Sequence, residues 1–375
     1  MIPCLTIVPK ITLANKMKTM RVDLDEITSQ HKEFNLLPST IGTELIVPDE
    51  RETSSKIYEQ IFGRTEERDT ILATLSKSMT EELTILPIYG IGGLGKTTLA
   101  QMVYRSSQFS DYSHVWVYVS QTFDLKKIGN SIISQLSEKE SHYSGMQMIE
   151  NSLTHLFANK KILIVLDDLW EDKKTDLYKL KGMLNVGHGS NVIVMVTTRS
   201  EGIATEMSTI EPHKLALLSN GLCWSIIKHK SSFKKRDDKK ELKQIGKEIA
   251  SKCGGVALAA QSLGYVLQSM TSRQWKLMKD SDIWSMPDSK DPSFIHVLAS
   301  LRLSYSVMPA YLKLCFSYCA IFPKGHKIVK DDLIQQWLAL AFIEPTDLYT
   351  SWELGEIYIR QLLGLSFLQK SEVSF

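Results

Sequence analysis

Cysteine is scarce in this sequence, with five residues among 375, and this excludes the disulfide framework of a small secreted domain. Long apolar runs are missing too, because none approaches the roughly 18 residues of a membrane-spanning helix. The first residues, MIPCLTIVPK, lack a basic start and contain two prolines, which is not the pattern of a secretory signal peptide. We therefore expect a soluble protein without a membrane span, located in the cytoplasm with a nuclear pool.

A large net charge of either sign is also missing. Lys+Arg is 44 and Asp+Glu is 42, for a formal net charge of +2, which argues against a protein that coats a polyanion. The mostly basic stretch 228–243 contains interleaved acidic residues, so a solvated surface is favoured over a nucleic-acid patch. The region 294–375 shows no dense basic recognition helix, so we do not expect a nucleic-acid partner.

The length predicts two to three domains, at about 150 residues per domain. Residues 15–34 have apolar positions near helical spacing and predict one amphipathic helix. Residues 35–56 contain Pro38, Gly42 and Pro48, a composition typical of a linker. We therefore assign 1–56 to a residual coiled-coil helix and its linker.

Residues 57–205 alternate between short apolar runs and segments with helical spacing. Four runs lack polar alternation and are rich in β-branched residues, which favours strands covered on both faces. They are 85–89, 115–119, 162–166 and 192–196. Helix-length segments between them predict a parallel sheet with crossover helices, the α/β architecture of a P-loop NTPase domain. Pro87 inside the first run is predicted to be a local irregularity of that strand.

A phosphate-binding loop follows the first predicted strand. The segment GIGGLGKTT fits G-x-x-x-x-G-K-[ST], and we expect all of it to bind phosphate. Its residues are Gly90, Ile91, Gly92, Gly93, Leu94, Gly95, Lys96, Thr97 and Thr98. The glycines allow positive φ and a close backbone approach, and successive N–H groups then form an anion nest at a helix N-terminus. Lys96 would contact the β- and γ-phosphates, and the Thr97 hydroxyl would bind Mg²⁺.

Acidic residues follow the third predicted strand, in KILIVLDDLW. Asp167 is expected to hold Mg²⁺, and Asp168 to polarise the attacking water. An aspartate after a strand can instead cap a helix, and this alternative stays open for both residues. Arg199 follows the fourth predicted strand, after two threonines, where a guanidinium can contact the γ-phosphate. With Lys96 and Asp168, Arg199 completes the candidate catalytic set.

With these motifs in order, the chain resembles the NB-ARC module of plant intracellular immune receptors of the coiled-coil, leucine-rich-repeat class. The resemblance rests on the P-loop, on KILIVLDDLW, whose Trp170 marks that class, and on the segment that ends in Arg199. Further segments that match are Phe62-Gly63-Arg64, HVWVYVSQTFD, KLALLSNGLCWSIIKHKSSF, CGGVALAAQSLG and LRLSYSVMPAYLKLCFSYCAIFPKG. The resemblance adds Gly63, Arg64, Ala257 and Leu258 to the expected nucleotide site.

The resemblance implies a molecular switch of innate immune signalling, built from a nucleotide-binding domain (57–205), a helical bundle (206–288) and an incomplete winged helix (289–375). The expected cofactors are ADP or ATP with Mg²⁺, and the expected activity is at most a slow ATP hydrolysis that resets the switch. Expected protein partners are other immune receptors or signalling proteins, with self-association. A P-loop kinase is disfavoured by the helical segments after the fourth strand.

Several departures from the family motivate an alternative. The bundle motif carries Ala257 where the family has proline, the Met-His-Asp motif is absent, and the module is expected to be truncated at both ends. The alternative is a non-switching interaction or decoy protein that keeps the fold. Outside the site, Cys315 and Cys319 are spaced i, i+4 and are expected to be core thiols, not a metal pair.

Overall fold

The computed structural model describes residues 61–368 except 79, 120–122, 172, 187–188, 286–291, 323–325 and 327. The predicted amphipathic helix at 15–34 and the linker at 35–56 lie outside the described residues. Within the described ranges, no helix combines the length and apolar character that crossing a bilayer requires.

The described elements alternate between strands and helices up to residue 214 and are helical thereafter. The strands are β1 (Leu83–Tyr89), β2 (Ser113–Tyr118), β3 (Lys161–Leu169), β4 (Asn191–Thr198) and β5 (His213–Lys214). The helices are α2 (Thr65–Lys77), α3 (Lys96–Tyr104), α4 (Leu125–Ser137), α5 (Met146–Phe157), α6 (Lys174–Leu184), α7 (Glu201–Met207), α8 (Asn220–Lys230), α9 (Lys239–Lys252), α10 (Ala257–Gln268), α11 (Ser272–Lys279), α12 (Pro292–Ser306), α13 (Ala310–Tyr318), α14 (Lys330–Ala339) and α15 (Ser351–Gly364).

The strands form one parallel sheet in the order β2-β3-β4-β1-β5. The four predicted strands, the parallel direction and the crossover helices are confirmed. The short β5 was not predicted, because two residues paired beside the end of β1 leave no periodic signal. In this order β4 lies between β1 and β3, so the segments that follow these three parallel strands meet at one edge of the sheet.

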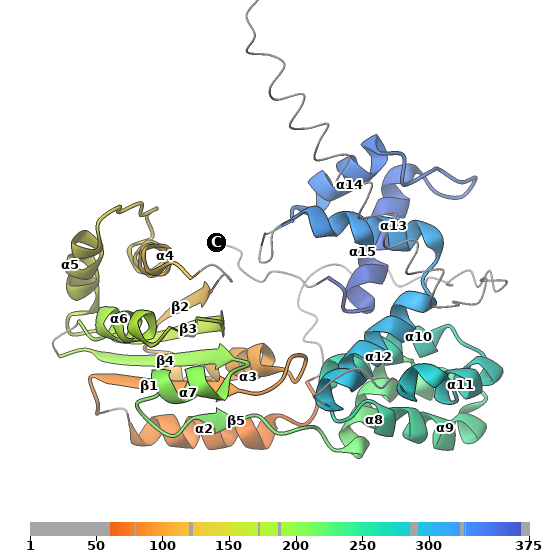
Figure 1. The fold of residues 1–375 in the computed structure, drawn as a ribbon, viewed down its shortest axis with the longest axis horizontal. Helices are drawn as coiled ribbons and strands as arrows, with labels where there is room; N and C mark the ends of the chain where they lie inside the picture. Colours follow the sequence, from red (N-terminus) through yellow and green to blue (C-terminus); the bar gives the residue numbers. More distant parts are fainter. Residues whose placement is uncertain are drawn as a thin grey trace, which may run out of the picture. The chain divides into compact units, whose positions relative to one another are not determined.

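Both faces of the sheet are covered, as the unbroken apolar runs predict (Figure 1). One face, with Ile164 and Val194, packs against α4, α5, α6 and α7. The other face, with Leu163 and Ile193, packs against α2 and α3. Since successive side chains of a strand point to opposite faces, two covered faces require an apolar residue at nearly every position.

Pro87 lies in the middle of β1, opposite Val196 of β4. The neighbouring odd-numbered residue Ile85 directs its N–H and its carbonyl toward Thr209, away from β4. The Pro87 nitrogen points to that same side, because backbone groups alternate along a strand. Pairing with β5 starts only at Ile88, so the missing N–H removes no ladder bond. The predicted irregularity is absent, because β1 pairs with β4 from Leu83 to Tyr89 without a register shift.

Helices α8 to α11 form a bundle around two tryptophans. Trp275 is fully buried, and its indole N–H donates to the Leu267 carbonyl at 3.0 Å. Trp224 is buried beside Phe233, edge to face with ring centroids 5.0 Å apart. Gly246 of α9 lies against both indoles, because a Cβ added there would be 2.3 Å from Trp224 Cζ3 and 3.0 Å from Trp275 Cζ3. The close approach of α9 to the rings therefore requires glycine.

Helices α12 to α15 follow, and a buried polar contact joins α12 to the bundle. The Ser262 and Ser304 hydroxyls are 2.6 Å apart, and Ser304 donates to the Ser300 carbonyl. Trp337 of α14 is fully buried. Thr350 caps α15 in a reciprocal capping box with Glu353, which fixes the start of that helix.

Cys315 and Cys319 lie at the C-terminal end of α13 and in the turn after it, and Cys315 is fully buried. Burial raises the pKa of the Cys315 thiol to about 12. Across the part of the chain that the structure describes, no group of three His, Cys, Asp or Glu side chains is placed to hold a metal ion. The prediction of core thiols is confirmed for Cys315.

The packing around Gly246 generates a prediction with an internal control. Gly246→Ala should lower the free energy of unfolding by about 1–3 kcal/mol, since the added methyl overpacks the indoles. Gly182→Ala in α6, where a Cβ would meet nothing within 4 Å, should instead stabilise the protein by about 0.5–1 kcal/mol through helix propensity. Denaturant unfolding of both variants measures the difference. Equal effects would show that the indoles do not limit the space at Gly246.

Candidate nucleotide-binding site

The predicted phosphate loop connects β1 to α3 at the carboxyl edge of the sheet. Gly90, Gly93 and Gly95 have φ of 149°, 77° and 97°, conformations that strain any residue with a Cβ. Gly95 is the N-cap of α3, which begins at Lys96. The first N–H groups of a helix have no intrahelical acceptor, so the loop ends where backbone donors are available to an anion.

Lys96 folds back over this loop. Its Nζ donates to the Gly90 carbonyl at 2.8 Å and to the Ile91 carbonyl at 2.9 Å, and the side chain is 8% exposed. Burial, with a smaller effect from the Arg199 charge, lowers the pKa of Lys96 to about 8. The ammonium therefore both holds the loop closed and supplies a poorly solvated positive charge to any phosphate there.

Thr97 and Asp167 come together as a hard-oxygen pair. The Thr97 hydroxyl donates to Asp167 Oδ1 at 2.9 Å, and Thr197 on β4 donates to the same oxygen. Burial raises the pKa of Asp167, against the lowering effect of the Thr197 and Thr97 hydrogen bonds. A hydroxyl beside a carboxylate is a ligand set that suits Mg²⁺, so these residues fit the metal role expected for them.

Asp168 occupies an irregular position near the end of β3. Its φ is 61°, a left-handed conformation that Asp tolerates better than most residues. Its N–H donates to the Thr197 hydroxyl at 2.8 Å. The alternative that Asp168 caps a helix is wrong, because the next helix, α6, has Lys173 as its N-cap. Asp167 does not cap a helix either, because its carboxylate accepts hydrogen bonds from the Thr97 and Thr197 hydroxyls.

Arg199 follows β4 and reaches the phosphate loop from the side. A Cβ added to Gly92 would lie 3.2 Å from Arg199 Nη1, so the guanidinium covers that glycine. Its Nε lies 4.0 Å from Asp168 Oδ1, and its Cζ lies 4.5 Å from the centre of the Trp170 ring. The structure thus brings Arg199, Asp168 and the loop together, as the sequence predicted.

Arg64 lies on the other side of the loop and is 3% exposed. Its Nη2 donates to the carbonyls of Leu94 and Ala216, each at 3.0 Å, and its Nη1 pairs with Glu67. The guanidinium therefore joins the phosphate loop to the segment that enters the bundle. Gly63, at φ 68°, lies against the Leu222 side chain. Arg64 therefore contacts the loop through the Leu94 carbonyl, whereas Gly63 contacts α8.

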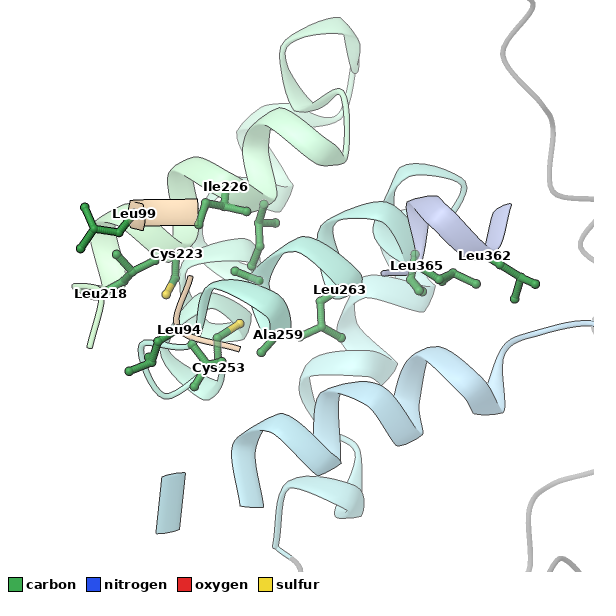
Figure 2. Close-up of a cluster of buried hydrophobic side chains, with 14 of the residues drawn as sticks. Leu94, Leu99, Leu218, Cys223, Ile226, Cys253, Ala259, Leu263, Leu362 and Leu365 are labelled. Atoms are coloured by element: carbon green, nitrogen blue, oxygen red, sulfur yellow. The ribbon is translucent and has the colours of Figure 1, made fainter. Parts of the chain in front are cut away.

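Leu258 and Ala257 connect the bundle to the loop directly. The Leu258 N–H donates to the Gly93 carbonyl at 3.0 Å, and a Cβ on Gly93 would lie 2.9 Å from Leu258 Cβ and 3.1 Å from Val256 Cγ1. Ala257 is the first residue of α10 and packs on the apolar core. Leu94 of the loop is buried among bundle side chains that include Leu218, Cys223 and Cys253 (Figure 2).

The arrangement fits the polyphosphate of a nucleotide. The loop offers helix N-terminal donors and glycines whose missing side chains leave the backbone accessible. Lys96 and Arg199 supply two cations, and Thr97 with Asp167 supplies oxygen ligands for a divalent ion. This donor set can bind a di- or triphosphate with Mg²⁺.

The sequence did not predict that two further residues, Thr197 and Trp170, contribute to the site. Thr197 holds both acidic residues through one hydroxyl, and the Trp170 ring supports Arg199. Finding them required the register of β3 against β4, in which Leu166 pairs with Val196 and Leu169 pairs with Thr198. The sequence signal that could have found them is their position at the end of two neighbouring parallel strands.

The lowered pKa of Lys96 predicts how affinity depends on pH. Above about pH 8 the lysine of the free protein is neutral, and binding of a phosphate then requires proton uptake, since the complex favours the charged form. The Kd of ADP should rise about tenfold per pH unit above about pH 8. Calorimetry in buffers of different ionisation enthalpy would measure both effects. A constant Kd up to pH 9.5, with the fold intact by thermal melting, would contradict this account.

Comparison with known proteins gives consistent matches. Residues 64–238 match the NB-ARC domain model and residues 321–374 the disease resistance protein winged helix domain model. The putative disease resistance protein RGA1 of Solanum bulbocastanum is 34% identical over 367 residues, which cover 96% of this chain and 37% of that protein. The putative disease resistance RPP13-like protein 1 of Arabidopsis thaliana is 32% identical over 97% of this chain and 35% of that protein.

A solved structure shows the same fold. It is a signal transduction ATPase with numerous domains and a tetratricopeptide repeat sensor, from Pyrococcus horikoshii. The TM-score is 0.50 at 16% identity, over 86% of this chain and 42% of that one. The chain spans little more than a third of the length of the plant relatives it matches. With a P-loop α/β domain, a helical region and both domain matches in order, this chain contains an NB-ARC domain and a disease resistance protein winged helix domain and is similar to plant disease resistance proteins.

Proposed function

We propose that this chain is the adenine-nucleotide switch of a plant defence receptor. The observation that carries the proposal is the bond from the Leu258 N–H to the Gly93 carbonyl. This hydrogen bond joins the phosphate loop to the first turn of α10. A change in the conformation of the loop would therefore act directly on the bundle.

Two further contacts support the same coupling. Arg64 links the Leu94 carbonyl to the Ala216 carbonyl, and Leu94 is buried in the core cluster that includes Leu218 and Leu263 of the bundle side (Figure 2). Packed interfaces have discrete arrangements instead of deforming continuously. A nucleotide that favours one loop conformation would therefore favour one arrangement of the bundle.

We propose the following roles for the site residues. Lys96 would contact the β- and γ-phosphates, and Thr97 with Asp167 would hold Mg²⁺. Arg199, above Gly92, would bind the terminal phosphate, and Asp168 would orient the water. Hydrolysis would be slow and would reset the switch.

The switch requires that ADP and ATP differ in their contacts. A ligand shifts an equilibrium only by its differential affinity for the two states. Arg199 is suited to make that difference, because its half-exposed side chain lies beside the loop and is not fixed in it as Lys96 is. We propose ADP for the resting form and ATP for the active form, which would associate with itself or with other immune receptors in the cytoplasm.

The primary test is the nucleotide that the purified chain carries. The protein should copurify with ADP, and Lys96→Ala should lower ADP affinity by about ten- to hundredfold, since a charged hydrogen bond is lost. Lys276→Ala, which removes an exposed lysine paired with Glu241 in the bundle, is the matched control and should bind as wild type. Chromatography of the released nucleotide and calorimetry give the two readouts.

Two results would contradict the switch. A folded wild-type chain that carries no nucleotide and has no Mg²⁺-dependent ATP affinity would favour the alternative of a non-switching interaction or decoy protein. Rapid phosphate transfer to an acceptor, in the range of about 1–100 per second typical of kinases, would favour a metabolic enzyme.

Ala257 provides a second prediction. Val256 before it has φ −93° and ψ 118°, which suits a residue that precedes proline, and Ala257 is the first residue of α10, where proline is tolerated. Ala257→Pro should therefore stabilise the fold by about 0.4–1 kcal/mol and keep ADP affinity. Ala260→Pro, which removes the bond from the Ala260 N–H to the Val256 carbonyl, should destabilise by about 3 kcal/mol. Thermal melting and calorimetry compare the two, and a destabilised Ala257→Pro would contradict the assigned geometry.

A further inference from the structure

Trp170 and Arg199 lie side by side because of an irregularity in the sheet. From Leu166 to Leu169, β3 advances three residues, while β4 advances two, from Val196 to Thr198. One extra residue on β3 is a bulge, which shifts every later position of that strand by one. Without it Trp170 would be opposite Ser200. With it, the register continued one residue beyond the pair of Leu169 and Thr198 places Trp170 opposite Arg199.

Asp168, inside this bulge, adopts the left-handed φ of 61°. Two threonine hydroxyls of β4 hold the bulge from both sides. Thr197 accepts the Asp168 N–H at 2.8 Å, and Thr198 donates to the Leu169 carbonyl at 2.8 Å. The register that aligns Trp170 with Arg199 is therefore fixed by side-chain hydrogen bonds as well as by the ladder.

The Arg199 side chain is 46% exposed, so this long flexible side chain has several conformations available. Three groups surround the guanidinium in the conformation that the structure shows. The Trp170 ring centre lies 4.5 Å from its Cζ, within the about 6 Å of a cation–π contact. Asp168 Oδ1 lies 4.0 Å from its Nε, and Gly92 of the phosphate loop lies beside Nη1. The indole is the one apolar face among them.

We propose that Trp170 is a positioning residue for ATP discrimination, which holds the Arg199 guanidinium over Gly92 where the terminal phosphate would bind. The proposal rests on the proposed function and deepens it. Since ADP lacks the terminal phosphate, Trp170 should affect ATP affinity and leave ADP affinity unchanged. A cation–π contact at a partly exposed site corresponds to a change of about two- to fivefold.

The experiment compares Trp170→Leu, Trp170→Tyr, Arg199→Ala and the double variant Trp170→Leu/Arg199→Ala. Calorimetry measures the Kd of a non-hydrolysable ATP analogue and of ADP separately. Trp170→Leu should weaken the ATP analogue about two- to fivefold without changing ADP, and Trp170→Tyr should restore most of the loss. In the Arg199→Ala background, Trp170→Leu should add nothing, because the group it positions is gone.

A second readout is spectroscopic. The chain has seven tryptophans, so the emission of Trp170 is obtained as the difference between wild type and Trp170→Phe. That difference should change on addition of the ATP analogue and stay constant with ADP. Thermal melting of each variant reports folding independently of nucleotide.

The outcomes separate this proposal from the proposed function. If Arg199→Ala alters the ATP-to-ADP ratio and Trp170→Leu does not, the positioning role is overturned and the switch stands. Equal loss of ATP and ADP affinity in Trp170→Leu, or a full additional loss in the Arg199→Ala background, overturns it as well. If Arg199→Ala leaves the ratio unchanged, or wild type binds neither nucleotide, the assigned role of Arg199 fails and this proposal fails with it.

Discussion

The buried ammonium of Lys96 is the group on which the rest of the site depends. It donates to two carbonyls of its own loop, which turns those oxygens inward and leaves the N–H groups of the loop and of α3 for an anion. The glycines permit this shape because they reach positive φ without strain. Burial makes the charge costly, as the lowered pKa shows, and a phosphate would compensate that cost.

Two neighbouring parts of the structure contact this loop. On one side the bulged end of β3 presents Asp167 and Asp168, held by the Thr197 hydroxyl. On the other side the bundle contacts Gly93 through the Leu258 N–H. In the proposed switch, the bundle would be the part that moves, since the sheet edge is fixed by its ladder and α10 is a separate element.

Much of the site was predictable because its chemistry is local in sequence. A glycine-rich loop followed by Lys96 and Thr97 requires eight consecutive residues, and unbroken apolar runs identified the strands that carry the acids and Arg199. The helix-cap alternative for Asp168 could not be decided from sequence, since an aspartate after a strand has the same local pattern in a bulge and in a cap. The sequence did not predict the two-residue strand β5 or the role of Thr197, because both depend on pairing with a distant segment.

By itself the sequence determined the fold class, the phosphate loop and the order of the acidic and basic residues that follow it. These are set by residue type and by periodicity along the chain, which need no partner. Only the tertiary structure decided that Trp170 faces Arg199 and that Leu258 holds Gly93. Strand register and helix docking bring together residues that are far apart in the chain, and a one-residue bulge changes which of them meet.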